Sequence, residues 1–422
     1  MQEAGSSIAQ GSDDWAGIEK GGIEKGRVDK GTVELRPDLL SGVSLPAAVI
    51  HEAPLAHNLA WMQRFAEAHG ARLAPHGKTT MTPALFRRQL EAGAWGITLA
   101  TAPQCRAAFT HGVRRLLMAN QLVGQANMAM VAELIAAGAE FYCVVDGVEN
   151  VRQLGRFFAE RSLRLAVLVE LGVPGGRCGC RNQKAVEELA EAIAAEPALI
   201  LAGLEGYEGV VHGEDPAAAV SAYAQRLVET ALALDAAGRF DVAAPIVTAS
   251  GSAWYDLIAE AFHAASLDDR FVPVLRPGCY VVHDHGLYRE AQRDVLRRRP
   301  DLQHGLEPAL EVFAQVQSLP EPGLAIVALG KRDIGHDQLP VPLRRYREGG
   351  VPDATLSVAG WQVAKLMDQH TFVYLPDAAD DVAVGDIVAF GASHPCLTFD
   401  KWRHLLLVNE ALEVQDSLAT CF

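Results

Sequence analysis

The stretch RLAPHGKTTMTPALFRRQLEAGAWGITLAT, residues 72–101, contains the pattern that decides the fold. It begins with a short apolar run, passes through a turn that carries Lys78 into a stretch with helical spacing, and ends with a second apolar run at 96–101. A strand, a helix and a second strand in this order form one βα unit, in which the two strands are parallel. This stretch therefore predicts a parallel sheet covered by helices.

The same alternation extends over more than half of the chain. Short runs of β-branched or apolar residues alternate with alanine-rich stretches in which apolar residues recur at helical spacing, as they do in 55–65. About eight such units in roughly 230 residues favour a closed (β/α)8 barrel over an open sheet. The expected strands are 47–51, 73–76, 96–101, 115–120, 141–146, 163–171, 199–205, 245–250 and 271–276.

The two ends of the sequence differ from this middle part. Residues 1–32 are rich in Gly, Ser and charge and offer little to bury, so we expect a flexible arm there. After about residue 290, Pro, Gly and short alternating runs dominate, which predicts a mainly β domain. The expected organisation is an arm at 1–32, one or more strands at 33–46 that join the β domain, the barrel at 47–289 and the C-terminal β domain at 290–422. The strands expected in that last domain are 310–316, 323–329, 372–375, 386–390 and 405–408.

Composition excludes several classes of function. A net charge of −15 argues against a nucleic-acid-binding face but leaves room for one anionic cofactor, which needs only a local group of donors. No apolar run approaches the roughly 20 residues that span a bilayer, so we expect no membrane segment. Seven dispersed cysteines do not resemble a disulfide framework, and the N-terminus lacks a secretory pattern, so we expect a cytoplasmic protein.

Residues that directly follow the apolar runs are the first candidates for a site, because a barrel places its active site at the C-terminal ends of its strands. Lys78 follows the run 73–76 and a glycine. Burial there would lower its pKa, which suits Schiff-base chemistry, although a surface lysine in a βα loop would occupy the same position. Arg177 and Tyr207 also follow strand ends, and packing or surface contacts would explain either of them.

Two later segments have the composition of a phosphate-binding site. Small residues and hydroxyls before a helix N-terminus can cradle a phosphate, and barrels often bind one after their late strands, although an ordinary helix cap has the same composition. The first segment supplies Thr248, Ser250, Gly251 and Ser252. The second supplies Gly278, where the backbone can approach a ligand closely, and then Cys279 and Tyr280.

His394 and Cys396 are the candidate metal ligands. An imidazole and a thiolate two residues apart can reach one Zn²⁺ from a loop or a strand. Two protein ligands make a plausible catalytic site if water and substrate fill the remaining positions. The alternative is a lone histidine beside a buried cysteine.

Taken together, these segments resemble the D-threonine aldolase and D-serine dehydratase family of pyridoxal-phosphate (PLP) enzymes. The resemblance is carried by 72–83, 93–101, Arg177, Tyr207, 248–252, 276–280, 330–333 and 394–401. It implies an alanine-racemase-like fold (fold type III), in which a PLP-binding (β/α)8 barrel precedes a β domain, and a homodimer whose subunits complete each other's sites. It also implies a divalent metal, which is usually held by His-x-Asp in the aldolases and by His-x-Cys, with zinc, in the dehydratases. The pair His394 and Cys396 therefore resembles the dehydratase branch.

The resemblance also implies a role for each candidate. Lys78 holds PLP as a Schiff base and, once displaced by the substrate amine, removes the α-proton of a D-amino acid, while zinc on His394 and Cys396 stabilises the leaving hydroxide. His76 tunes Lys78 or is an ordinary strand-end histidine. The residues expected to contact the cofactor are Lys78, Arg177, Tyr207, Thr248, Ser250, Gly251, Ser252, Gly278, Cys279 and Tyr280.

The expected reaction converts D-serine, or a related D-3-hydroxy amino acid, into a 2-oxo acid and ammonia. The nearest alternative on the same scaffold is an aldolase that releases glycine and an aldehyde. A dehydratase of a bulkier substrate such as a 3-hydroxyaspartate is a second alternative, and a non-catalytic PLP carrier is a third.

Overall fold

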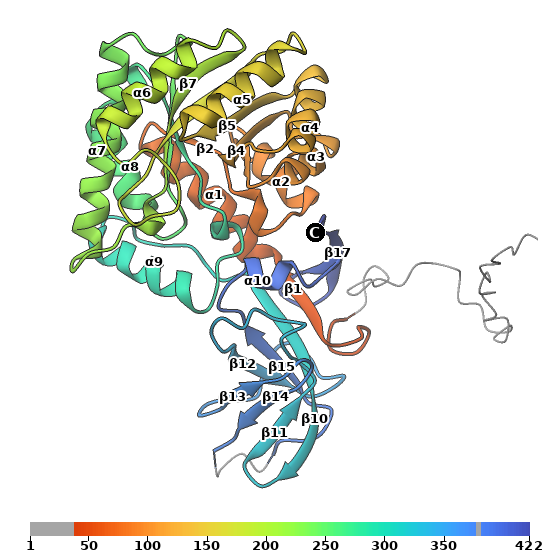
Figure 1. The fold of residues 1–422 in the computed structure, drawn as a ribbon. Helices are drawn as coiled ribbons and strands as arrows, with labels where there is room; N and C mark the ends of the chain where they lie inside the picture. The colour runs from red at the N-terminus through yellow and green to blue at the C-terminus, as the bar shows by residue number, and fades with distance from the viewer. Residues whose placement is uncertain (1–37, 377–380) are drawn as a thin grey trace, which may run out of the picture.

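The computed structural model describes residues 38–376 and 381–422. The arm expected at 1–32 therefore lies outside the described residues. Figure 1 shows a large α/β unit above a smaller β domain, with α9 (Leu287–Arg298) beside the junction of the two. The boundary expected at 289/290 falls inside this helix.

The large unit is a closed barrel of eight parallel strands, which confirms the predicted (β/α)8 architecture. Hydrogen bonds join the strands in the order β2-β9-β8-β7-β6-β5-β4-β3. A parallel bridge between His76 and Thr98 joins the two ends of this order and closes the ring. The strands are β2 (Arg72–Leu73), β3 (Ile97–Leu99), β4 (Arg115–Gln121), β5 (Glu140–Val145), β6 (Leu165–Leu171), β7 (Leu199–Gly206), β8 (Ile246–Ala249) and β9 (Val272–Leu275).

Helices cover the outside of the ring, and alternating side chains of the strands fill its interior. α1 (Glu52–Ala68) buries Leu55, Leu59, Met62 and Phe65, as their spacing predicts. The other barrel helices are α2 (Pro83–Glu91), α3 (Ala102–Thr110), α4 (Gln125–Ala136), α5 (Val148–Ala159), α6 (Gln183–Ala194), α7 (Pro216–Ala236) and α8 (Tyr255–Ala264). Short 3₁₀ helices form at η1 (Gly77–Thr79), η2 (Glu208–Val210), η3 (Leu267–Asp269) and η4 (Cys279–Val281). Within the described ranges, no helix has the length and apolar character that a membrane span requires.

The smaller domain is built on a nine-stranded sheet. One of its strands was expected in the barrel, and the structure corrects that expectation. Residues 47–51, expected as the first barrel strand, form β1 (Ala47–His51), which pairs antiparallel with β10 and parallel with β16. β1 therefore belongs to the C-terminal sheet and not to the barrel. The other strands are β10 (Leu310–Glu321), β11 (Leu324–Val327), β12 (Val341–Tyr346), β13 (Gln362–Leu366), β14 (Thr371–Tyr374), β15 (Ile387–Gly391), β16 (His404–Val408) and β17 (Val414–Ala419).

The described part of 33–46 joins this domain without forming a strand. Asp38 makes a single antiparallel bridge with Glu413, and the Leu39 N–H donates to the Leu412 carbonyl at 3.0 Å. Leu39 packs in the core of the β domain together with Phe313. Residues 33–37 lie outside the described ranges.

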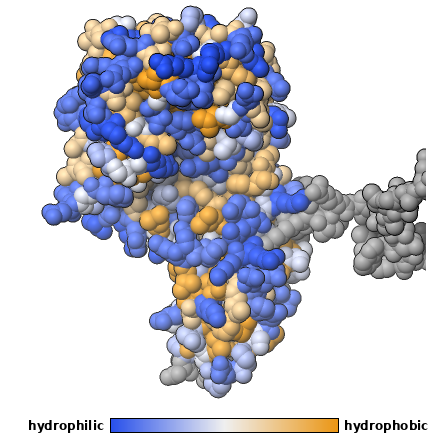
Figure 2. Space-filling model, viewed as in Figure 1, coloured by the Kyte–Doolittle hydropathy of each residue, from blue (hydrophilic) through white to orange (hydrophobic). Residues whose placement is uncertain are grey.

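Exposed apolar side chains are a feature of the smaller domain. Figure 2 shows apolar residues gathered on its visible face, below a barrel surface that is largely hydrophilic. Val341, Met367 and Tyr374 are among the large hydrophobic residues exposed in this domain.

Candidate active site

A cavity of about 170 Å³ lies at the C-terminal ends of the barrel strands. It brings together four residues expected at the site: His76, Lys78, Arg177 and Tyr207. A larger hollow of about 370 Å³ lies beside the end of β1, but none of the expected site residues lines it. The smaller cavity is therefore the candidate site.

Lys78 lies on η1, directly after β2, and its side chain is open to the cavity. Desolvation by the surrounding protein lowers the pKa of Lys78, and the positive charges of Arg177 and Arg276 lower it further, while Cys396 and Cys279 oppose the shift. A lowered pKa increases the fraction of neutral amine, which is the form that attacks a carbonyl or accepts a proton.

The neighbours of Lys78 share its partly desolvated surroundings. Burial lowers the pKa of His76 to well below its usual range, and the adjacent Lys78 adds to this effect, so the imidazole is neutral. The Nδ1 atom of His76 is buried without a partner among the described residues. The guanidinium of Arg177 lies 4.7 Å from the centre of the Tyr207 ring, a cation–π distance.

Two acidic residues of the cavity were missed by the sequence-based site prediction, whereas the third charged residue, Arg276, lies in the segment 276–280 that carries the resemblance. Glu170 on β6 and Glu205 on β7 are neighbours in the parallel register, and Arg276 follows β9. Arg276 forms a buried ion pair with Glu205 and donates to the Gly206 carbonyl at 2.8 Å. Burial raises the pKa of Glu170 to about 7, and the nearby Glu205 adds to the shift. The strand-end argument that identified Arg177 and Tyr207 applies equally to these acids and would have found them.

The segment expected to bind phosphate offers backbone donors directly after β8. The N–H groups of Ser250 and Gly251 donate to the Glu208 carboxylate at 3.1 and 2.5 Å. Thr248 is fully buried, and its hydroxyl donates to the Val274 carbonyl at 2.9 Å. Two N–H groups that bind one carboxylate have the chemistry of an anion site, which at present holds a carboxylate of the same chain.

A second pair of donors faces Ser252. Its Oγ accepts hydrogen bonds from the Gly278 and Cys279 N–H groups at 3.1 and 3.0 Å. A Cβ at Gly278 would lie 2.6 Å from Thr79 Oγ1 and 2.8 Å from the His76 carbonyl oxygen, so only glycine fits there. Tyr280, expected beside these donors, is buried in the barrel core, where its hydroxyl accepts from Gln89 at 3.3 Å.

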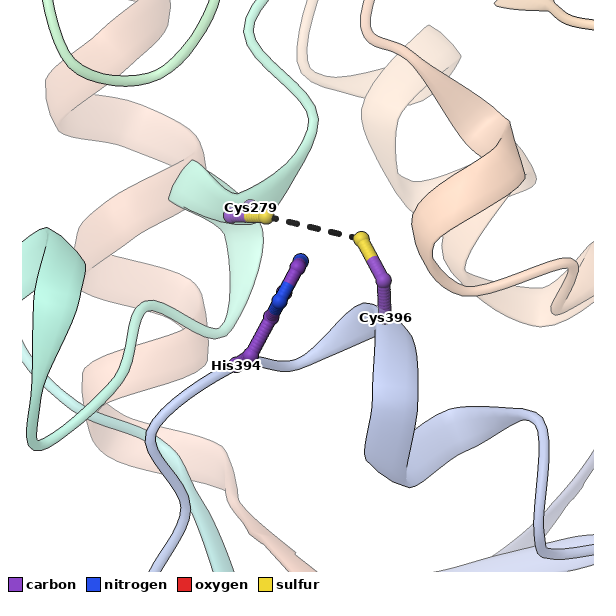
Figure 3. A group of neighbouring side chains, drawn as sticks. All are labelled: Cys279, His394 and Cys396. Atoms are coloured by element: carbon purple, nitrogen blue, oxygen red, sulfur yellow. Dashed lines mark hydrogen bonds between the residues drawn. The ribbon is translucent and has the colours of Figure 1, made fainter. Parts of the chain in front are cut away.

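The candidate metal ligands lie beside Lys78 and have an additional neighbour. Cys279, His394 and Cys396 bring one sulfur, one nitrogen and one sulfur within 4.8 Å of one another (Figure 3). The side chain of Cys279, expected at the cofactor, therefore lies with the metal ligands. Cys396 opens α10 (Cys396–Phe399), which packs against η1, and its Sγ is 3.4 Å from Thr79 Oγ1.

Local contacts favour the thiolate form of Cys396, which binds metal, and the protonated form of His394, from which a metal would displace a proton. A hydrogen bond with the Cys279 thiol lowers the pKa of Cys396 to about 4, and His394 and Thr79 contribute to the same shift. A hydrogen bond with Cys396 raises the pKa of His394 to about 9, and Asp337 adds to it. His394 Nδ1 donates to Asp337 at 2.8 Å, which leaves the other ring nitrogen for a metal. Asp337 gives no signal in the sequence, since it lies 57 positions before His394.

The residues present fit both groups that the resemblance implies. Lys78, Arg177 and Arg276 surround the cavity with cations, and Arg276 Nε, like His76 Nδ1, is buried without a partner among the described residues. Such orphaned polar atoms around a cavity suit a polar, anionic cofactor such as PLP. Two sulfurs and an imidazole suit zinc.

Comparison with known proteins agrees with this geometry. Residues 50–282 match the family described as the alanine racemase N-terminal domain, and residues 309–408 match a putative serine dehydratase domain. The chain is 27% identical over 386 residues to a D-threonine aldolase of Arthrobacter sp., covering 89% of this chain and 92% of that one. It is 29% identical over 252 residues to a D-threo-3-hydroxyaspartate dehydratase of Delftia sp., covering 58% of this chain and 63% of that one. The crystal structure of a D-threonine aldolase from Filomicrobium marinum superposes with a TM-score of 0.75 at 23% identity, over 92% of this chain and 98% of that one.

Proposed function

The chain belongs to the alanine-racemase-like family of PLP enzymes, and on that premise we propose that it is a PLP- and metal-dependent lyase of D-3-hydroxy amino acids. The reaction we favour is the dehydration and deamination of D-serine, or of a related D-3-hydroxy amino acid, to a 2-oxo acid and ammonia. The names of its relatives support this substrate class, because they denote an aldolase and a dehydratase of D-configured 3-hydroxy amino acids.

One observation carries the proposal: an amine of lowered pKa and a group of soft metal donors lie at the same strand ends. Thr79, the neighbour of Lys78, lies 3.4 Å from Cys396 Sγ, so the two groups are one residue apart. Loss of water from a 3-hydroxy amino acid needs a base at Cα and an acid at the hydroxyl oxygen. Lys78 and the metal donors provide these two functions side by side.

The residues of this chain would divide the work as follows. Lys78 would attach PLP and later accept the proton from Cα, since its lowered pKa favours the neutral amine. His394 and Cys396 would hold the metal, and Asp337 orients His394 through its Nδ1 hydrogen bond. When bound, PLP supplies an electron sink for charge at Cα, and the metal supplies a Lewis acid for the hydroxyl oxygen.

The surrounding side chains would position the cofactor. Glu205 fixes the guanidinium of Arg276 at the base of the cavity, and Tyr207 supports that of Arg177. The N–H groups of Ser250 and Gly251 would receive the phosphate if Glu208 withdraws its carboxylate.

The second candidate function is that of an aldolase, which the 27% identity to the Arthrobacter D-threonine aldolase favours. An aldolase base takes the hydroxyl proton, and the Cα–Cβ bond then breaks. Cys396 argues for the dehydratase, because the aldolases that this sequence resembles usually have an aspartate there.

A single assay separates these candidates. The purified protein with PLP is incubated with the D- and L-forms of serine, threonine and 3-hydroxyaspartate, with zinc and after its removal, and keto acid, ammonia and glycine are all measured. The proposal expects equal amounts of keto acid and ammonia from a D-substrate, dependent on metal. Glycine would identify an aldolase, and PLP binding without any turnover would identify a carrier.

The proposal includes a homodimer in the cytoplasm, as the sequence implies. Exposed apolar residues on the β domain, such as Val341, Met367 and Tyr374, are consistent with a surface that is covered in solution. Light scattering of the purified protein should give twice the chain mass of 45.3 kDa, and a monomer at working concentrations would contradict the dimer.

A further inference from the structure

We infer that Cys279 is a third protein ligand of the metal, so that the site offers two thiolates and one imidazole. The inference rests on the proposed metal-dependent function. It adds a ligand that the resemblance does not imply, because the resemblance concerns only His394 and Cys396.

The distances between the three donors match those of a tetrahedral metal site. The sulfurs of Cys279 and Cys396 are 3.8 Å apart. Two sulfurs that each bind one tetrahedral zinc at about 2.3 Å are roughly 3.8 Å from each other. A disulfide would bring the same atoms to about 2.05 Å. The spacing is therefore the one expected of two ligands of one ion.

The directions of the side chains agree with the distances. In Figure 3, Cys279 from η4 and Cys396 from the start of α10 point their sulfurs toward each other, and His394 points a ring nitrogen at the space between them. Asp337 holds the opposite ring nitrogen at 2.8 Å, and its second oxygen accepts from Ser393 at 3.0 Å. An imidazole fixed in this way by a carboxylate is typical of a metal ligand.

The fold explains why Cys279 reaches this position. Gly278, which has no side chain, lets the backbone at the start of η4 lie directly against Thr79 and His76, and Cys279 is almost completely buried. Its sulfur lies 3.9 Å from Thr79 Oγ1, and the sulfur of Cys396 lies 3.4 Å from the same hydroxyl. Both sulfurs thus border the segment that carries Lys78.

A third ligand changes which metal the site selects. Soft thiolates favour zinc, cadmium and cobalt over magnesium and manganese, and two thiolates favour them more strongly than one. Three protein ligands also leave one tetrahedral position open, which is the number a catalytic zinc site keeps for water or substrate.

The test counts the sulfurs around bound zinc by X-ray absorption spectroscopy of the full-length protein, without substrate. Wild type should show two sulfur neighbours, and Cys279→Ser should show one. Zinc affinity in Cys279→Ser, measured against a competing chelator, should fall by at least the roughly 10- to 100-fold that loss of an outer partner costs. Cys421→Ser, at a cysteine outside the cluster, is the matched control. It should keep the two sulfur neighbours and the zinc affinity of wild type.

A second variant separates ligation from a merely structural role. Cys279→Asp replaces sulfur by oxygen and should shift the metal preference toward manganese, with circular dichroism confirming that the protein is folded. One sulfur in wild type, two sulfurs in Cys279→Ser, or a Cys279–Cys396 disulfide in protein kept under reductant would overturn the inference. Metal binding is measured apart from turnover, so a lyase with one sulfur ligand would refute only this inference. Two sulfur ligands in a protein without lyase activity would refute only the proposed function.

Discussion

Lys78 is the residue on which the proposed chemistry depends. Replacing it in Lys78→Ala removes both the covalent attachment of PLP and the base at Cα, so activity should fall by at least about 100-fold. The visible absorption of the bound cofactor should disappear as well. Lys184→Ala, at an exposed lysine of α6, is the control and should change neither. An unchanged absorption band in Lys78→Ala would exclude Lys78 as the attachment site.

The buried ion pair between Glu205 and Arg276 predicts a stability effect. Both side chains are 4% exposed, so Glu205→Ala leaves a guanidinium without its partner in a desolvated site. The free energy of unfolding in urea should fall by about 3–5 kcal/mol. Glu191→Ala, which removes an exposed partner of Arg239, should cost at most about 1 kcal/mol. Equal losses in the two variants would show that the Glu205 pair is not desolvated in solution.

At the scale of single residues, the sequence mainly identifies candidate site residues that directly follow a predicted strand. The positions of Lys78, Arg177 and Tyr207 at one cavity could be predicted, because the end of a parallel strand can be located from the chain alone, while their roles remain proposals. Cys279 was assigned to the cofactor, although its thiol faces Cys396, which is 117 positions away. Contacts between two domains at that separation leave no periodic signal in either segment.

At the scale of elements, the barrel strands could be predicted because each combines an apolar run with a following amphipathic helix. The sheet to which β1 belongs could not, since its partners β10 and β16 follow the whole barrel in the sequence. β12, β13 and β17 were also missed. β13 and β17 lie at the two ends of the main strand order, and β12 pairs only with β15 among the described strands. Such edge strands expose polar residues and lose the apolar pattern.

The contact between η1 and η4 predicts the effect of one added methyl group. In Gly278→Ala the new Cβ would lie 2.6 Å from Thr79 Oγ1, and the crowding should cost about 1–3 kcal/mol of stability and weaken PLP binding. Gly147→Ala is the matched control, because no atom lies within 4 Å of a Cβ placed there. PLP titrations and thermal melts of both variants measure the difference. If Gly278→Ala bound PLP with the affinity of wild type, η1 and η4 would have to separate freely to make room for the methyl group.

At the scale of the whole molecule, two buried histidines should make stability depend on pH in mild acid. Burial lowers the pKa of His283 and of His285 to about 4, against about 6.5 in an unfolded chain, so between these values the unfolded state binds more protons. The contribution of these two histidines to the free energy of unfolding is fully present above about pH 6.5 and is lost as the pH falls toward 4. Burial raises the pKa of Asp284 to about 6 and that of Glu170 to about 7, and it also raises the pKa values of Glu205 and Glu208, so these carboxyls work in the opposite direction in mild acid. The prediction therefore concerns the difference between wild type and a variant that lacks one of these histidines.

Urea unfolding at several pH values between 7 and 5 tests this expectation. As the pH decreases, the urea midpoint of wild type should fall relative to that of His285→Gln, because only wild type has the neutral buried His285. His304→Gln, at an exposed histidine, should leave the pH dependence as in wild type. An identical pH dependence of the midpoint in wild type and His285→Gln would contradict the assignment of a neutral buried His285.

Metal binding should stabilise the entire chain, since His394 and Cys396 come from the β domain and Cys279 from the end of the barrel. At a free zinc concentration 100 times the dissociation constant, the gain is about 2.7 kcal/mol. The melting temperature should therefore fall when a chelator removes zinc. His394→Ala should melt at the same temperature with and without zinc, and a similar zinc effect in that variant would place the ion elsewhere.

The position of β1 in the C-terminal sheet has a consequence for synthesis on the ribosome. Its two neighbours, β10 and β16, are translated only after the entire barrel, so β1 emerges with both edges unpaired and more than 250 residues ahead of the nearer partner. A nascent chain halted at the end of the barrel would expose this unpaired apolar strand, which could associate with other proteins. Chaperone capture should therefore be strongest for such truncated chains and should weaken when residues 38–51 are removed from them.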